Sequence, residues 1–327
     1  MKRVLSFIFC LISASLAFTG ERFAGEWELS SSVGLQMTPK NKAVVAEKSD
    51  DCKKNYFAKI TGVNIPAPYG QFVANYKIPL NFGESIVFQD ANITLSGELN
   101  LTPVTYENQA IIYFSPSPVL TFSFESVAAT GWSLFGTDGL ALYDKSSDSY
   151  KALTPFCDWK YSFAGKAEFQ FDFGFLFPGE WTHVVTKLSY TARYEACTAA
   201  SRYMPWAAIG SETANGFTYS ATGILGYMLP FKLNLIGLAV NFKGHFDGKD
   251  FGEYDSNYDG DFTEISFALQ AVMKLNEKNE LNFGAAVPSR RAFTSEVEDG
   301  KACVSKTTGG REWYFNGVSL VWKHNFL

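Results

Sequence analysis

Eight ionisable side chains recur at spacings that are multiples of two within two neighbouring segments of the chain. They are Lys160, Lys166, Glu168, Asp172, His183, Lys187, Arg193 and Glu195. On an extended strand such spacing puts side chains on one face. Charges on a shared face need water or one another, because an unpaired charge in an apolar interior is very costly. Facing a water-filled passage, they would select the ions that pass. As a cross-strand ladder, they would brace the wall. The two roles are compatible.

A second cluster of oxygen-bearing side chains lies in the acidic segment 255–260, Asp-Ser-Asn-Tyr-Asp-Gly. It resembles the first half of an EF-hand-type calcium loop, in which alternate oxygen ligands and a glycine at the sixth position wrap a hard cation. The resemblance implies Asp255, Asn257 and Asp259 as ligands of a structural Ca²⁺. The twelfth position is Ser266, where that family has a bidentate glutamate. We therefore favour a solvated acidic loop rich in turn residues, and expect no other cofactor.

The first group of charges belongs to a segment, 159–177, in which one residue in two is apolar. Its odd positions include Trp159, Phe169 and Phe177, and its even positions carry most of the charges. Alternation predicts a strand with an aromatic face and a polar face. Soluble strands usually have about five or six residues, whereas a tilted strand needs about 9 to 11 to cross a bilayer. The segment is therefore long enough for a transmembrane strand.

Similar alternating segments recur along the whole chain. Clear examples are 91–101, 217–229 and 263–275. We expect about twelve strands, with ten or fourteen possible, because the pattern is weak from Leu99 to Asp144. A change of parity near Gly237 predicts a β-bulge. The predicted connections are alternately long and short, which is typical of outer-membrane barrels with long extracellular loops and short periplasmic turns.

The N-terminus has the features of an export signal. Lys2 and Arg3 precede the apolar run 4–18, and Ser15-Leu16-Ala17 fits a cleavage site. We predict a secretory signal peptide over 1–17 and a single domain over 18–327. Its removal leaves 26 Lys+Arg against 33 Asp+Glu, a net charge of −7. That balance argues against nucleic acid as a partner.

Four cysteines remain after signal removal, and all fall in or beside predicted long loops. They are Cys52, Cys157, Cys197 and Cys303. Exported loops are a compartment where disulfides persist, so we expect at least one bridge, and the sequence leaves three pairings open. A metal cluster is not expected, because no histidine lies nearby in the sequence.

The C-terminal segment alternates Val318, Leu320, Trp322 and Phe326 with polar residues. It resembles the terminal strand of bacterial outer-membrane β-barrel proteins, porin-like in type, although Leu327 follows the aromatic residue that ends the family pattern. The resemblance implies an all-β fold, a single antiparallel transmembrane barrel in the outer membrane with both termini periplasmic. It also implies contact with lipid and recognition by the barrel-assembly machinery. A soluble periplasmic β-sandwich is the alternative fold.

For function, we expect passive transport of small solutes through a polar lumen of mixed charge. The alternatives are a surface-binding or structural barrel with a plugged lumen, and a barrel-borne hydrolase. None of His183, His245 and His324 begins a hydrolase motif, and no glycine-rich phosphate loop or zinc spacing is present. We therefore predict that the protein is not an enzyme. The sequence indicates no oligomeric state.

Overall fold

The computed structural model describes ten ranges of the chain. They are residues 25–42, 55–64, 66–83, 88, 90–144, 146–147, 149–209, 211–250, 260–294 and 307–326. The predicted signal peptide 1–17 lies outside them. So do Cys52, Cys303 and the predicted calcium ligands Asp255, Asn257 and Asp259, and these predictions remain untested.

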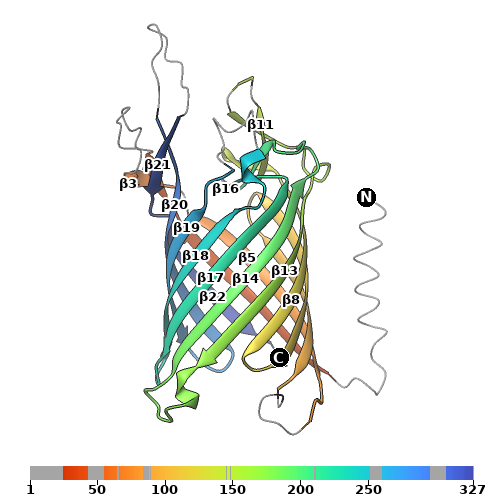
Figure 1. Cartoon of the computed structure of the whole chain (residues 1–327), viewed down its shortest axis with the longest axis vertical. Coiled ribbons are helices and arrows are strands. Elements are labelled where there is room, and N and C mark those ends of the chain that lie inside the picture. The colour runs from red at the N-terminus through yellow and green to blue at the C-terminus, as the bar shows by residue number, and fades with distance from the viewer. Residues whose placement is uncertain are drawn as a thin grey trace.

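Twelve antiparallel strands close into a ring (Figure 1). They are β1 (Glu26–Met37), β5 (Ala67–Pro79), β6 (Asn92–Leu101), β7 (Thr105–Ser117), β8 (Leu120–Gly131), β13 (Lys160–Asp172), β14 (Val184–Cys197), β17 (Gly216–Met228), β18 (Leu233–His245), β19 (Glu264–Lys274), β20 (Asn279–Thr294) and β22 (Gly317–Asn325). Each pairs with the ring strands before and after it. The first and last close the barrel in register from Ser30↔Asn325 to Met37↔Val318. The predicted all-β barrel of about twelve strands is confirmed.

Alternation along each strand separates an outer face from an inner face. On β13, Phe163 and Phe169 are each 43% exposed on the outside, while Ser162 and Ala164 are buried on the inside. The same pattern holds on β22, where Val318, Leu320 and Trp322 face outward and are exposed. The barrel therefore turns its large apolar side chains outward, the reverse of a water-soluble protein.

Strand β13 is shorter than the alternation predicts. It ends at Asp172, and Phe173–Phe175 forms the 3-10 helix η1. A carboxylate oxygen of Asp172 accepts a hydrogen bond from the Gly174 N–H, which starts this turn. The prediction of a strand to Phe177 was wrong because the Asp172 carboxylate caps a turn and redirects the backbone. The alternation of phenylalanines continues in the sequence beyond the end of the strand.

The predicted bulge at Gly237 was also wrong. Gly237 pairs regularly with Gly226, and the shift of register lies between Leu233 and Leu235. Leu235 faces the interior, where a Cβ on Gly226 would lie 3.2 Å from its Cδ1 atom. The absent side chain of Gly226 thus makes room for Leu235 on the inner face. This inward apolar residue interrupts the alternation of the sequence, which is why the pattern suggested a bulge.

Connections of different length lie at the two ends of the ring. The long ones, at one end, are 38–66, 132–159, 198–215, 246–263 and 295–316. At the same end, the tight connection 102–104 joins β6 to β7. Strand β7 is longer at both ends than the sequence pattern suggests. There the Thr102 hydroxyl accepts hydrogen bonds from the N–H groups of Val104 and Thr105. The predicted alternation of long and short connections is present with this one exception.

The long connections carry short strands of their own. Above β1 and β20 these are β2 (Pro39–Lys42), β3 (Asn55–Phe57), β4 (Lys59–Val63) and β21 (Thr307–Trp313). A small hairpin consists of β9 (Ser133–Leu134) and β10 (Thr137–Asp138), and Gly248–Asp250 forms the 3-10 helix η2. No helix among the described residues is long and apolar enough to cross a membrane.

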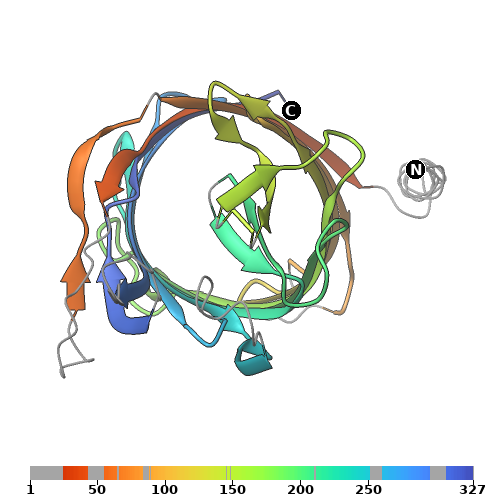
Figure 2. The same cartoon turned by 90° about the horizontal axis from the view of Figure 1, so that it is seen from above.

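A separate four-stranded sheet, which we call the cap, lies inside the outline of the ring when the barrel is seen from above (Figure 2). Its strands are β11 (Leu140–Asp144), β12 (Ser149–Ala152), β15 (Pro205–Ala208) and β16 (Ser211–Ala214). It comes from the connections that flank β13 and β14 and lies over one side of the mouth, leaving the other side clear.

Candidate functional site

The inner face of β13 and β14 carries a carboxylate held between two ammonium groups. Glu168 Oε2 lies 2.5 Å from Lys166 Nζ, and its Oε1 lies 2.6 Å from Lys187 Nζ. The Glu168 side chain is only 13% exposed, so its charge depends on these partners. The register of β13 with β14 brings Lys187 opposite Gln170, one position along the inner face from Glu168.

Two further ion pairs continue this charged wall toward the mouth. Arg193 Nη1 lies 2.8 Å from Glu125 Oε1 on β8 and donates to Ser162 Oγ at 3.1 Å. Lys160 Nζ lies 3.7 Å from Glu107 Oε2 on β7. All these pairs run along the wall. Among the described residues, no ion pair reaches from this wall to β1, β19, β20 or β22.

Neutralising Glu168 should destabilise the barrel. A Glu168→Gln variant leaves two ammonium groups beside an uncharged amide, so we expect a loss of about 1–3 kcal/mol in the free energy of unfolding. Urea unfolding of the barrel in detergent, followed by tryptophan fluorescence, measures the loss. The double variant Glu168→Gln/Lys187→Gln should recover part of it. Equal stability of E168Q and the parent would show that the pairs contribute nothing.

Asp172 and His183 lie together at the end of the barrel opposite the cap. His183 Nδ1 is 2.7 Å from Asp172 Oδ2. A Cβ on Gly174 would lie 2.4 Å from His183 Nδ1, so the glycine gives the imidazole its place. His183 precedes β14, and the pair therefore orders the turn from β13 to β14 at the exit of the lumen, apart from the ladder that contains Glu168.

Glu195 connects the wall to the cap. Its carboxylate is buried and accepts a hydrogen bond of 2.7 Å from the Thr213 hydroxyl on β16. Of the eight sequence-predicted charges, this one lies under the cap. The sequence missed Glu107 and Glu125, which pair with predicted residues. Their inward parity was the available signal, but Glu107 falls in the stretch where the strands are hardest to predict.

The cap is packed as tightly as a protein core. Trp206 and Cys197 are fully buried with Leu140. The Asn215 side chain joins cap and wall. Its Oδ1 accepts from Cys197 N at 2.7 Å and Trp206 Nε1 at 2.9 Å, and its Nδ2 donates to the carbonyls of Cys197 and Ala200. A half-buried amide with all these hydrogen-bonding capacities used fixes the cap in one position.

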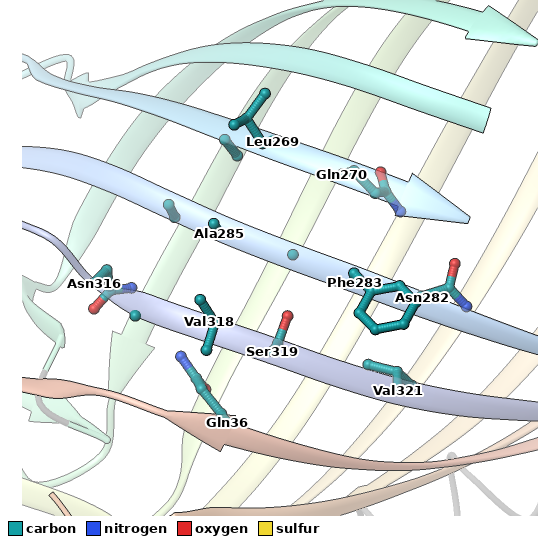
Figure 3. Close-up of a pocket in the computed structure, with 14 residues that line it drawn as sticks. Gln36, Leu269, Gln270, Asn282, Phe283, Ala285, Asn316, Val318, Ser319 and Val321 are labelled. Atoms are coloured by element: carbon teal, nitrogen blue, oxygen red, sulfur yellow. The ribbon is translucent and has the colours of Figure 1, made fainter. Parts of the chain in front are cut away.

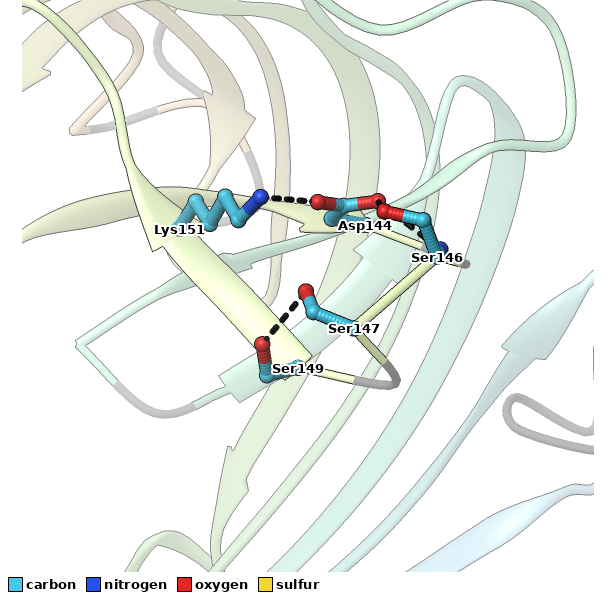
Figure 4. A network of polar contacts seen from close by, with 5 residues as sticks. All are labelled: Asp144, Ser146, Ser147, Ser149 and Lys151. Atoms are coloured by element: carbon cyan, nitrogen blue, oxygen red, sulfur yellow. Dashed lines mark hydrogen bonds and ion pairs between the residues drawn. The ribbon is translucent and has the colours of Figure 1, made fainter.

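The β11–β12 hairpin of the cap is held by Asp144 (Figure 4). The carboxylate accepts hydrogen bonds from the N–H and hydroxyl of Ser146 and pairs with the Lys151 ammonium. These contacts, that with Lys151 foremost, hold the pKa of Asp144 well below its ordinary value. The carboxylate therefore stays charged at any physiological pH.

Two cysteines and three histidines lie within the described residues. Cys157 is exposed and Cys197 buried, and both are free thiols, so they are not bonded to each other. A bridge that involves Cys52 or Cys303 remains a prediction. His183, His245 and His324 lie on different parts of the ring. Within the described part of the chain, no group of three or more His, Cys, Asp or Glu side chains is placed to hold a metal ion.

The wall formed by β18, β19 and β20 carries both charged and small side chains on its inner face, because Lys243, Glu264 and Glu280 share the inward parity. Its inward positions on β18, β19 and β20 include Gly237, Ala239, Ala268, Gly284 and Ala286. A recess of about 300 Å³ lies where β19, β20, β22 and β1 meet (Figure 3). The lumen therefore has a ladder of ion pairs beneath the cap, and a recess lined by uncharged side chains on the side that the cap leaves clear.

No protein-family model matches the sequence, and no curated protein matches it. Solved structures of similar overall shape include an outer-membrane channel from Pseudomonas putida F1, with 10% identity, a TM-score of 0.43, and coverage of 94% of this chain and 98% of that one. The translocator domain of the autotransporter NalP from Neisseria meningitidis has 10% identity, a TM-score of 0.35, and coverage of 99% and 96%. The outer-membrane channel DcaP of Acinetobacter baumannii has 9% identity, a TM-score of 0.37, and coverage of 94% and 99%.

Proposed function

We propose that the chain forms a pore in the bacterial outer membrane and lets small polar solutes diffuse through its lumen. One observation carries the proposal: the ion pairs of β7, β8, β13 and β14 lie along one wall of the lumen, and among the described residues none of them reaches across to β1, β19, β20 or β22. A plugged barrel of this size would need side chains that meet across its interior. The mechanism is diffusion past fixed polar groups and requires no catalytic step.

The membrane location is supported by the outer face and the strand lengths. Ring strands have 9 to 16 residues, enough for the ~9–11 that cross the hydrocarbon. Their outward side chains are apolar and exposed, and a closed ring satisfies every backbone group without water. We place the long connections and the cap outside the cell and both termini in the periplasm. Assembly through the C-terminal strand, β22, fits this placement.

The two faces of one strand provide a matched test of the membrane location. Leu188→Arg puts a guanidinium on the outer face, where we expect a loss of about 2–4 kcal/mol in folding free energy in lipid. Ser189→Arg, the adjacent inward position opposite Glu168, should cost less, because a guanidinium on the inner face of the barrel is outside the lipid. Urea titration in phospholipid vesicles measures both. Equal stability of the two variants would contradict a lipid-facing outer surface.

Liposome swelling tests the transport itself. Vesicles that contain the folded barrel should swell in iso-osmotic solutions of small neutral sugars, more slowly as the sugar becomes larger, while vesicles without protein should not. If the vesicles swell in none of these sugars, the result contradicts an open pore. It would favour a surface-binding barrel, a candidate to which the well-packed cap at the mouth gives specific support.

A further inference from the structure

The recess has a floor of small residues. It includes Gly284, Ala268 and Ala286, which share the inner face of β19 and β20. A Cβ on Gly284 would come within 2.6 Å of Ser319 Oγ, so a larger residue would close the space. Gly317, at φ +107°, is required by its backbone, and a Cβ there would lie 2.0 Å from the Met37 carbonyl oxygen.

Four amide side chains and one hydroxyl surround this floor (Figure 3). They are Gln36, Gln270, Asn282, Asn316 and Ser319. The register explains their convergence: Gly284 pairs with Gln270 on one side and Ser319 on the other, and Ser319 pairs with Gln36. Each amide offers both hydrogen-bond donors and acceptors.

These amides are free to bind a solute. Within the part of the chain that the structure describes, the side chains of Gln36, Gln270 and Asn282 make no hydrogen bond to protein. The charged wall differs, because Glu168, Lys187 and Arg193 are all committed to partners. The recess therefore brings several uncommitted hydrogen-bonding groups together at one place.

We infer that this recess is a binding subsite for an uncharged, polyhydroxylated solute of the size of a simple sugar. The inference rests on the proposed function and names the class of solute. Hydroxyl groups both donate and accept, as the amides do, and no ionisable side chain lines the recess. The small floor and Val321 suit the C–H face of such a solute. A volume of about 300 Å³ is at the lower end of ligand sites.

Saturation-transfer NMR with D-glucose tests the inference on the folded full chain in a detergent without a sugar headgroup. We expect glucose to bind the parent. The double variant Gln270→Ala/Asn282→Ala should bind glucose at least about tenfold more weakly, because two neutral hydrogen bonds are lost. Gln109→Ala is the matched control. This inward glutamine on β7 lies away from the recess, and its removal should leave the dissociation constant unchanged.

Salt dependence gives an independent readout. Binding by amides should be the same at about 0.1 M and about 1 M KCl, whereas attraction to the charged ladder would be screened. Ala286→Leu puts a larger side chain into the recess and leaves all the amides in the sequence, so it should also abolish binding. It replaces the double variant if that protein does not fold. Absence of glucose binding to the parent, or equal affinity of the parent and the recess variants, would overturn the inference.

The measurement needs no open pore, so the two proposals can fail separately. Glucose binding that depends on the recess, without solute flux, would retain the subsite and remove the transport function. Flux with no binding at the recess would leave a pore without this subsite.

Discussion

Reversal of two lumen charges, Lys166→Glu with Lys187→Glu, should make the pore strongly selective for cations. Both ammonium groups lie within 2.6 Å of Glu168, so the change puts three carboxylates on adjoining inward positions of β13 and β14. A local change of four unit charges beside the path should raise the cation-to-anion permeability ratio by about fivefold or more, or roughly 1 kcal/mol. Arg193→Glu should add to the shift. Reversal potentials under a KCl gradient measure the ratio.

Lys59→Glu is the matched control for this experiment. Lys59 is exposed on β4, outside the ring of twelve strands, and its reversal should leave the selectivity unchanged. If the lumen variant shifts selectivity no more than K59E, the ladder braces the wall and does not select ions.

The second large effect is expected in the cap. Trp206→Ala removes a fully buried side chain and a hydrogen bond to Asn215, which should cost about 3–5 kcal/mol of local stability. The cap should then detach from the wall while the ring, whose hydrogen bonds are independent of it, stays closed. Because the cap lies over one side of the mouth, conductance should rise. Hydrogen exchange of β11 and β15, measured beside single-channel current, would report both changes.

A second tryptophan distinguishes loss of the cap from general loosening. Trp27, 45% exposed on the outer face of β1, touches no part of the cap, and Trp27→Ala should change neither exchange in the cap nor conductance. A W206A protein with parent-like conductance and a melted cap would show that the cap does not restrict the mouth.

The barrel could be predicted because alternation is a local property of the chain. Phe163 and Phe169 face outward for the same reason that Lys166 faces inward, and neither requires knowledge of a partner. The cap could not be predicted this way. Leu140 and Trp206 lie in short strands with no repeated pattern, and their burial depends on a contact between two connections that are far apart in the sequence.

For the candidate site, the sequence predicted which side chains lie on the inner face of the barrel, but not which of them contact one another. Parity put Glu168 and Lys187 on the inner face, but their direct contact depends on the register between strands. The same limit hid Glu125 as the partner of Arg193. Asp172 and His183 follow the parity yet lie in a capped turn. The recess gave no signal, because Gly284 and Ala286 have meaning there only beside the amides of neighbouring strands.

Planar-bilayer conductance of the mature chain is the most direct test of an open lumen. The sample should be refolded in detergent and shown to be folded by a change of gel migration on boiling. We predict discrete ohmic current steps, because the ion pairs of the ladder lie along one wall and a recess lies in the facing wall. A bilayer that stays silent with a demonstrably folded barrel would contradict the pore and identify the lumen as closed.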